Sequence, residues 1–382
     1  MIRKATTILS ILLVTIGLVA CDNGADPAPP DPGKKSDGDG KKAGDSKPAV
    51  ILSTDSSQFP VTRTNPDTGK TWTILRIMTD NGARETAKAN AEDVVNAHGD
   101  LVGAVGLWAY NPPLILQAVK AANKTGQIKI IGFDENIDTL QGIQDGTVVG
   151  TIVQNPYEFG FRSVEYLAAI ARGEKDKVMK QVPEDLILAV PERTITKDNV
   201  DEFKEITEKI QAGNGPIPKH PEYGSKDNRV KVAFIINQSD PFWELARAGC
   251  NKAGEEFGVD VDFRIPANGL AAEQQTFIED LMTTGAGGVA ISPVDAANQT
   301  DILNKAAKVM PVICQDSDAP DSDRLFYLGT DNYAAGRAAG KMVADSCPNG
   351  GKIVILVGKM EVRNAQERSQ GVIDVLLGQK SQ

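Results

Sequence analysis

The 382-residue chain has few of the residues on which enzymes and metal sites commonly depend. It contains two histidines, His98 and His220, and four cysteines with no CxxC pair, so neither a zinc site nor a disulfide framework is indicated. GxSxG, HExxH and P-loop motifs are absent. A nicotinamide-dependent oxidoreductase needs GxGxxG after its first strand, whereas the GAGG stretch that begins at Gly285 precedes a strand. We therefore expect no enzyme, no cofactor and no metal.

The charge balance excludes a second group of functions. The chain carries 51 acidic and 41 basic residues, which gives a formal net charge of -10. A surface of this sign repels phosphate groups, so neither nucleic acid nor an anionic membrane surface is expected as the main partner.

The N-terminus has the pattern of an exported lipoprotein. Arg3 and Lys4 precede an apolar stretch that is too short to span a bilayer, and LVAC ends that stretch at Cys21. Residues 1–21 are thus predicted to be a lipoprotein signal peptide that leaves Cys21 as the lipidated residue. Residues 22–48 are rich in Pro, Gly, Lys, Asp and Ser and are expected to form a disordered tether. The folded part would then face the periplasm or the cell exterior, held to a membrane through its lipid anchor only.

Three cysteines remain once Cys21 is set aside. Cys250, Cys314 and Cys347 allow one disulfide plus a thiol in an oxidising compartment, or buried thiols that pack like small apolar residues. The spacing does not decide between these alternatives.

Apolar runs alternate with amphipathic stretches twice along the chain, which is the rhythm of parallel α/β units. Expected strands of the first set lie at residues 72–78, 101–108, 128–133 and 148–154. Those of the second set lie at residues 230–237, 259–265, 287–293, 312–316, 325–330 and 352–358. The fold class predicted is α/β, with two Rossmann-like lobes of parallel sheet joined by a hinge.

The lobes are expected at residues 49–185 and 230–382. Residues 186–229 between them read as an extended hinge strand, a helix and a Gly/Pro-rich linker. A β-hairpin around NPDTG is expected before the first lobe.

Polar and aromatic side chains gather at the expected carboxyl ends of the strands, where open parallel sheets bind ligands. Amides, carboxylates and one guanidinium in such places can pair with vicinal hydroxyls, and aromatic rings can cover the C–H faces of a sugar. Single Asn and Asp residues at these positions can also serve only as helix caps. The candidate ligand-binding residues are Asn111, Asp134, Gln154, Asn237, Asp240, Phe242, Trp243, Asp316 and Arg368.

Several stretches resemble the ribose-binding type of periplasmic protein, a type I periplasmic binding protein. VAFIINQSDPFWELARAG, MPVICQDSDA and NAQERSQGV are similar to the N-terminal half of that family, whereas GFDENID and GTIVQNPYEFG are similar to its C-terminal half. The two halves stand in reversed order. The chain therefore resembles a circular permutant, with residues 212–229 joining what are termini in relatives; a truncated tandem array or an engineered rearrangement is the alternative.

The resemblance implies that the nine candidate residues contact a sugar, with Asp240, Phe242, Trp243, Asp316 and Arg368 contributed by the second lobe. Two departures bear on which sugar. Ser317 stands where ribose-binding relatives commonly have arginine, and Ala83 falls near the place of an aromatic that covers the ring in relatives. Trp108 or Tyr110 is a candidate to replace that aromatic.

The implied function is capture of a sugar by a monomer that passes it to the permease of an ABC-type importer, without chemistry. A ligand-sensing module that signals to a membrane receptor is the alternative. A nucleoside or an autoinducer is the alternative to a sugar as the bound solute.

Overall fold

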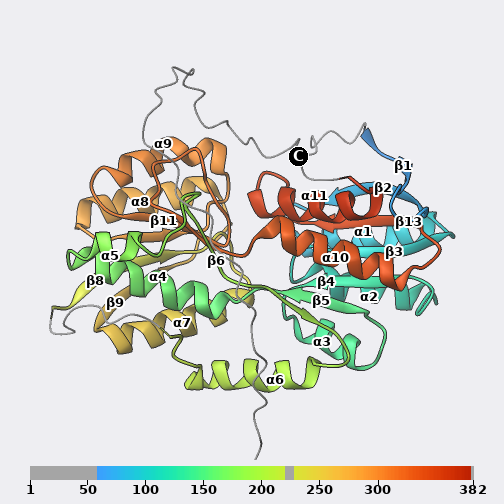
Figure 1. Ribbon diagram of the computed structural model, residues 1–382, viewed down its shortest axis with the longest axis horizontal. Coiled ribbons are helices and arrows are strands. Elements are labelled where there is room, and N and C mark those ends of the chain that lie inside the picture. The colour runs from blue at the N-terminus through green and yellow to red at the C-terminus, as the bar shows by residue number, and fades with distance from the viewer. Residues whose placement is uncertain (1–57, 220–227, 380–382) are drawn as a thin grey trace, which may run out of the picture. The chain divides into compact units, whose positions relative to one another are not determined.

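Two β-sheets, each covered by helices, organise the chain (Figure 1). The computed structural model describes residues 58–219 and 228–379. The predicted signal peptide (1–21), Cys21 and the tether (22–48) lie outside the described residues. Within the described ranges, no helix is long and apolar enough to cross a membrane.

The sheet of the first lobe has seven strands, and its inner strands run parallel. Its core strands are continuous apolar runs such as KIVILV, as expected for a parallel sheet that is buried on both faces. In spatial order the strands are β1 (Val61–Thr64), β2 (Thr71–Thr79), β13 (Gly351–Val357), β3 (Leu101–Gly106), β4 (Lys129–Phe133), β5 (Gly150–Val153) and β7 (Arg193–Ile195). The edge strands β1 and β7 are antiparallel to their neighbours, and β1 with β2 forms the predicted hairpin.

Helices cover both faces of this sheet. One face packs against α10 (Asn332–Ser346) and α11 (Arg363–Leu377). The other face packs against α1 (Arg84–Ala97), α2 (Asn111–Ala121) and α3 (Ile137–Gln144).

The second lobe repeats this three-layer arrangement around a sheet of six parallel strands. In spatial order they are β6 (Ile187–Ala189), β12 (Tyr327–Gly329), β11 (Val312–Gln315), β10 (Val289–Ile291), β8 (Val230–Ile235) and β9 (Val259–Arg264). The helices α4 (Pro156–Ala171) and α7 (Phe242–Phe257) cover one face, and α8 (Ala271–Thr284) and α9 (Ala296–Ala307) cover the other. A short helix, α5 (Lys175–Met179), follows α4.

The predicted fold class is thus confirmed, but the predicted lobe boundaries are wrong in two places. The strand β13 was expected in the second lobe, yet it pairs with β2 and β3 in the first, and α10 and α11 pack there with it. Conversely, α4 was expected to close the first lobe and packs instead on α7 in the second. Strand order along the chain does not show where the backbone crosses between sheets, because each crossover is decided by pairing between distant segments.

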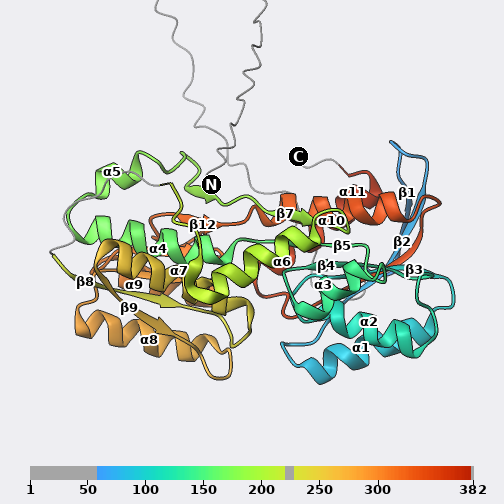
Figure 2. The same cartoon turned by 90° about the horizontal axis from the view of Figure 1, so that it is seen from below.

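The helix α6 (Val200–Lys209) lies across the two lobes and continues into a π-helical turn (Ile210–Asn214). Figure 2 shows it between α7 of the second lobe and α3 of the first. Val200 and Phe203 are buried in the core of the first lobe, while Ile206 and Ile210 pack against Tyr157 of the second. The chain therefore crosses between the lobes here as well as after β5, between β6 and β7, and after β12.

The two sheets have the same strand order when β13 is counted as the first strand of its lobe. The order is then second, first, third, fourth, fifth in β2-β13-β3-β4-β5 and in β9-β8-β10-β11-β12. The end of α11 also lies beside the start of this lobe, since Asn65 Nδ2 donates to the carbonyls of Val375 (2.9 Å) and Leu376 (3.1 Å). A large separation between these two segments would have excluded a circular permutation. The observed contact is compatible with one, and the permuted order stays a prediction.

Cys250, Cys314 and Cys347 are free, and all three are buried. Burial raises the pKa of the Cys314 thiol to about 12. The sequence left open one disulfide plus a thiol, or buried thiols, and the structure has the second of these.

The contact between α4 and α7 depends on Gly160 of α4 and Gly249 of α7, where the two helix backbones approach closely. This close approach gives a first prediction. A Cβ added at Gly249 would lie 2.0 Å from the carbonyl oxygen of Tyr157, so the helix backbones leave no room for a methyl group. Gly249→Ala is expected to lower the free energy of unfolding by about 1 to 3 kcal/mol, measured by urea denaturation. Gly99→Ala is the control, because a Cβ there meets nothing within 4 Å. Equal stability of both variants would contradict this packing.

Candidate functional site

Two carboxylates face each other from equivalent places in the two sheets. Asp134 follows β4 of the first lobe, and Asp316 follows β11 of the second. Both have backbone φ angles in the left-handed region, 65° for Asp134 and 60° for Asp316. A left-handed backbone conformation costs energy in residues other than glycine and is typical of functional sites. Here it occurs at the two turns that lead from the strand ends into the region between the lobes.

Each carboxylate is buried and accepts a hydrogen bond from a side chain of its own lobe. Gln154 Nε2 donates to Asp134 Oδ1 at 3.0 Å, and Ser292 Oγ donates to Asp316 Oδ2 at 2.8 Å. Burial raises the pKa of Asp134 to about 6 and raises the pKa of Asp316, and the Arg368 guanidinium opposes both shifts. The amide of Asn237 lies near Asp316, with its Nδ2 3.5 Å from Oδ2.

Arg368 supplies the one cation in this group. Its Nε donates to Asn332 Oδ1 and its Nη1 to the Leu107 carbonyl, each at 2.9 Å, and its guanidinium lies 4.7 Å from the centre of the Phe133 ring. Arg368 was expected from the second lobe, which is wrong: it lies on α11, which packs in the first lobe. Its Nη2 atom is buried and has no hydrogen-bond partner.

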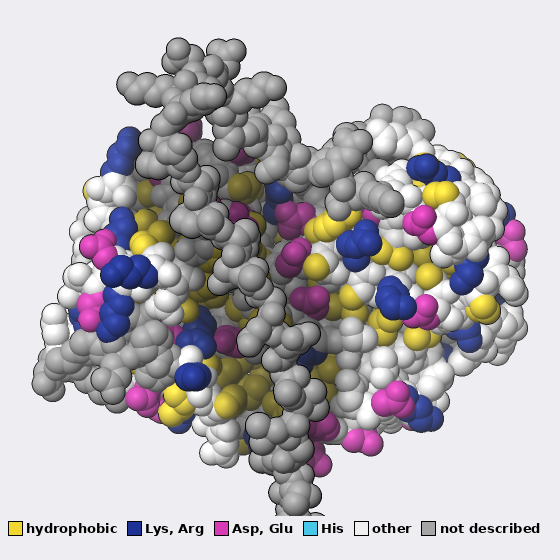
Figure 3. Space-filling view, viewed as in Figure 1, with side chains coloured by type: hydrophobic (Ala, Val, Ile, Leu, Met, Phe, Trp, Pro, Cys, Tyr) yellow, Lys and Arg dark blue, Asp and Glu magenta, His cyan; other side chains and the backbone are white. Residues whose placement is uncertain are grey.

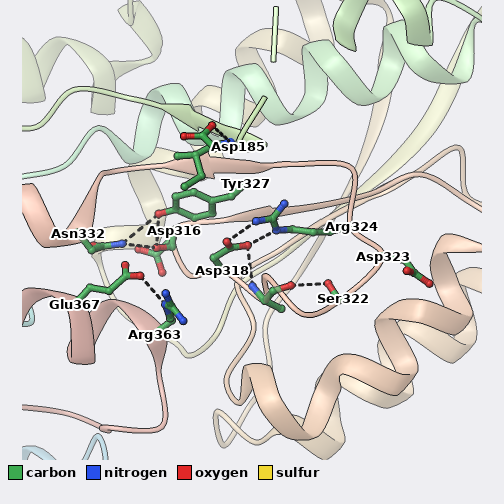
Figure 4. A network of polar contacts seen from close by, with 12 residues as sticks. Asp185, Asp316, Asp318, Ser322, Asp323, Arg324, Tyr327, Asn332, Arg363 and Glu367 are labelled. Carbon is green, nitrogen blue, oxygen red and sulfur yellow. Dashed lines mark hydrogen bonds and ion pairs between the residues drawn. The ribbon is translucent and has the colours of Figure 1, made fainter. Parts of the chain in front are cut away.

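A layer of buried polar groups fixes Asp316 from behind (Figure 4). Tyr327 Oη donates to the Asp316 carbonyl at 2.9 Å, and Asn332 Nδ2 donates to Tyr327 Oη at 3.2 Å. Because Asn332 also accepts from Arg368, this layer connects the Asp316 backbone of the second lobe to the first-lobe guanidinium. A shift between the lobes would therefore disturb both charged groups together.

Aromatic side chains form the remaining walls. Phe242 and Trp243 open α7, with their rings edge to face and their centres 5.0 Å apart. The Trp243 indole donates to Asn237 Oδ1 at 3.2 Å, which fixes both side chains. On the first lobe, Trp108 and Tyr110 stand at the end of β3, their rings also edge to face at 6.2 Å.

These groups enclose a cavity between the lobes. Eight of the nine candidate residues line it, and the ninth, Asn111, does not. The cavity is lined by Trp108, Ala109, Tyr110, Asp134, Gln154, Asn237, Gln238, Asp240, Phe242, Trp243, Asp316, Asn364 and Arg368.

Asn111 acts one layer below the cavity. Its Oδ1 accepts from the Trp108 backbone N–H at 3.1 Å, and its Nδ2 donates to Asp80 Oδ2 at 3.0 Å. Tyr110 Oη donates to the other oxygen of Asp80 at 2.5 Å. Asn111 and Asp80 thus orient the two aromatics of the first lobe.

The sequence predictions missed three cavity residues, Ala109, Gln238 and Asn364. Asn364 stands four residues before Arg368, so the two share one face of α11, and this helical spacing was available as a signal. Ala109 lies between Trp108 and Tyr110, the proposed substitutes for the missing aromatic, and both of these do reach the cavity.

Two polar contacts join the lobes at the mouth of the cavity. Arg84 Nη2 on α1 lies 3.0 Å from Asp240 Oδ2 of the second lobe, with its guanidinium 5.3 Å from the centre of the Tyr110 ring. Lys359 Nζ donates to the Gly269 carbonyl at 3.0 Å. Asp240 also accepts from the Phe242 backbone N–H at 3.0 Å, so it is held from both sides.

Charged side chains outside the cavity are candidates for metal ligands. Among the described residues, no group of three or more His, Cys, Asp or Glu side chains is placed to hold a metal ion. On the face shown in Figure 3, basic and acidic side chains are interspersed. What the cavity offers is three carboxylates, amides, a guanidinium and aromatic rings, contributed by both lobes.

Comparison with known proteins identifies this arrangement. The periplasmic binding protein domain matches residues 66–175 and 232–381. The chain belongs to this family. The predicted resemblance is thereby confirmed, while the lipid anchor and the permuted order stay predictions.

Similar proteins include sugar-binding ones. The ribose import binding protein of Haemophilus influenzae is 29% identical over 144 residues, which are 37% of this chain and 48% of that protein. The D-allose-binding periplasmic protein of Escherichia coli is 27% identical over 146 residues, 36% of this chain and 47% of that protein. The chain thus spans about half the length of the curated relatives that it matches.

Among solved structures, an ABC transporter solute binding protein from Burkholderia graminis, in complex with D-arabinose, is 28% identical with a TM-score of 0.38. The match covers 38% of this chain and 51% of that protein.

The contact between Arg84 and Asp240 gives a second prediction. The pair can form only when the lobes are closed, so its loss lowers the closed fraction and weakens every ligand by the same factor. For a partly exposed pair worth about 0.2 to 1 kcal/mol, Arg84→Ala should weaken binding roughly 1.4- to 5-fold, measured by calorimetry at low ionic strength. Lys88→Ala is the control, since Lys88 lies on the same helix and pairs with Glu92 of that helix. A loss that differs from ligand to ligand would show instead that Arg84 touches the ligand.

Proposed function

We propose that this protein captures a sugar between its two lobes and delivers it to an ABC-type importer. The observation that carries the proposal is a pair of buried polar atoms without partners, Arg368 Nη2 and Gln154 Oε1. Such atoms cost about 1 to 3 kcal/mol each when unsatisfied. Both belong to residues that line the cavity, so a ligand with several hydroxyl groups would satisfy the donor and the acceptor at once.

The chemistry of the walls supports a neutral, hydroxylated ligand. Asp134 and Asp316 accept hydrogen bonds from hydroxyls, while Arg368 donates to them, and charge-assisted bonds of this kind are the stronger ones. Phe242, together with Trp108, offers ring surface for the C–H face of a sugar. The similar ribose import and D-allose-binding proteins take ligands of this class.

Closure couples binding to delivery. A ligand that touches Asp134 on one lobe and Asp316 on the other makes both contacts only in the closed state, so it shifts the population toward closure. Hinge closure of periplasmic binding proteins is a known example of such motion. A permease that recognises both lobes at once would then select the loaded protein. Export and anchoring through Cys21 would place this step outside the cytoplasm.

Binding itself is the third prediction. A thermal-shift screen with pentoses, hexoses, inositols and nucleosides should find a ligand that, at about a hundred times its dissociation constant, adds ~2.7 kcal/mol of stability. Asp134→Ala and Arg368→Ala should each weaken that ligand by about 1.5 to 3 kcal/mol. Arg337→Ala is the control, because Arg337 is exposed on α10 outside the cavity.

Circular dichroism must show that each variant is folded. Unchanged binding by both variants would contradict the site, and no shift with any of the compounds would contradict the sugar proposal.

We further infer that the chain order is a circular permutation, supported by the common strand order of the two sheets and by the contact of Asn65 with the end of α11.

A reordered chain tests this inference and gives the fourth prediction. It would begin at Arg229, run to Gly378, pass through a short Gly-Ser linker to Lys70, and end at Gly213. Because only β1 and its pairing with β2 are lost and every other strand pairing is kept, this chain should fold and bind the ligand found for the parent. A reordered chain that is soluble but does not bind that ligand would contradict the inference.

A further inference from the structure

A second cavity adjoins the first on the side of α6. Its volume is about 340 Å³. The two cavities share Ala109, Asp134, Asp240 and Phe242 on their walls, so they meet at these side chains. We call this second cavity the α6 chamber.

The polar wall of the α6 chamber is one face of the helix α6 and the turn after it. Lys204, Thr207, Glu208 and Gln211 line the chamber at spacings of three and four residues, which is a single helix face. The apolar face of the same helix is already buried, with Phe203 in the first lobe and Ile206 and Ile210 on the second. The helix thus rests on both lobes and turns polar side chains into a space between them.

The remaining walls carry apolar side chains beside the polar Asp134, Glu135, Asn136 and Asp240. Leu140 lies on the first lobe, and Pro241, Phe242 and Leu245 lie on the second, all lining the chamber. A sugar ring has an apolar C–H face and a rim of hydroxyl groups. A chamber that carries both apolar and polar groups matches both surfaces of a ring, whereas a purely apolar ligand would leave the two buried Glu135 carboxylate oxygens without a partner.

The chamber also adjoins the first cavity on a side that Arg84, Lys359 and Gly269 do not line. At the mouth, Arg84 and Asp240 close the gap between the lobes, and Lys359 binds the Gly269 carbonyl beside them. A ligand too long for the first cavity therefore has room to extend past Phe242 toward α6, and not past the Arg84 contact.

We propose that the ligand is an oligosaccharide of at least two rings. One ring lies between Asp134 and Asp316, and the second lies in the α6 chamber between Phe242 and Thr207. This inference rests on the proposed function, because it extends the same sugar site.

Matched pairs of sugars test it as the fifth prediction. D-xylose and xylobiose, D-glucose and cellobiose, and D-galactose and galactobiose would be compared by titration calorimetry on the intact folded chain. In at least one pair the disaccharide should bind roughly tenfold tighter or more than its monosaccharide, as for the burial of one additional small group.

Variants of α6 locate the second ring. Thr207→Trp fills the chamber and should abolish the advantage of the disaccharide while the monosaccharide binds as before. Glu205→Trp is the matched control, since Glu205 is exposed on the same helix and lines neither cavity. Gln211→Trp, at the exposed end of the chamber, replaces Thr207→Trp if that variant does not fold.

The outcomes separate the two proposals. Monosaccharides that bind as well as their disaccharides in every pair would overturn the two-ring ligand and leave the sugar site standing. Equal weakening of both sugars by Thr207→Trp, with Glu205→Trp unchanged, would also overturn it. The absence of binding by every sugar would count against the proposed function itself.

Discussion

The structure depends on a guanidinium that is buried where the two lobes meet. Arg368 is 1% exposed, and a charge in such a place is tolerated only when it is paired and hydrogen-bonded. Leu107 and Asn332 accept two of its hydrogen bonds, and its charge opposes the rise of the pKa of Asp134 and of Asp316. The two carboxylates belong to different sheets, so a single cation on α11 balances the electrostatics of both lobes. Its unpartnered Nη2 atom is then the natural point for a ligand to complete the network.

The same constraint connects binding with motion. Opening the lobes separates Asp316 from Arg368 and from Asn364, whose Nδ2 lies 3.5 Å from Asp316 Oδ2, and it breaks the contact of Arg84 with Asp240. These polar contacts around the cavity therefore help to hold the two lobes together in the closed state. The helix α6 adds a contact on the far side of the cavity, where Phe203 and Ile210 anchor it to different lobes. It therefore bears on how far the lobes separate as well as on the shape of the site.

Much of the site was within reach of sequence reasoning. Asp134, Gln154 and Asp316 were identified because polar residues follow buried strands, and strand ends in parallel sheets converge at one edge. Asn111 satisfied the same pattern and yet lies below the cavity, since the turn after β3 uses its amide to hold Trp108 and Asp80. A residue type and a position after a strand do not show whether a side chain faces the ligand or supports the residue that does.

The sequence by itself determined the α/β class, the number and positions of most strands, and the kinds of side chain available to a ligand. These follow from local patterns: apolar runs buried on both faces, amphipathic helices, and polar residues at the ends of strands. Only the tertiary structure decided that β13 and α11 belong to the first lobe, that Arg368 therefore faces Asp316 across the cleft, and that α6 turns its polar face into a chamber. Each of these depends on pairing between segments that are far apart in the chain, and no local pattern encodes which sheet a strand will join.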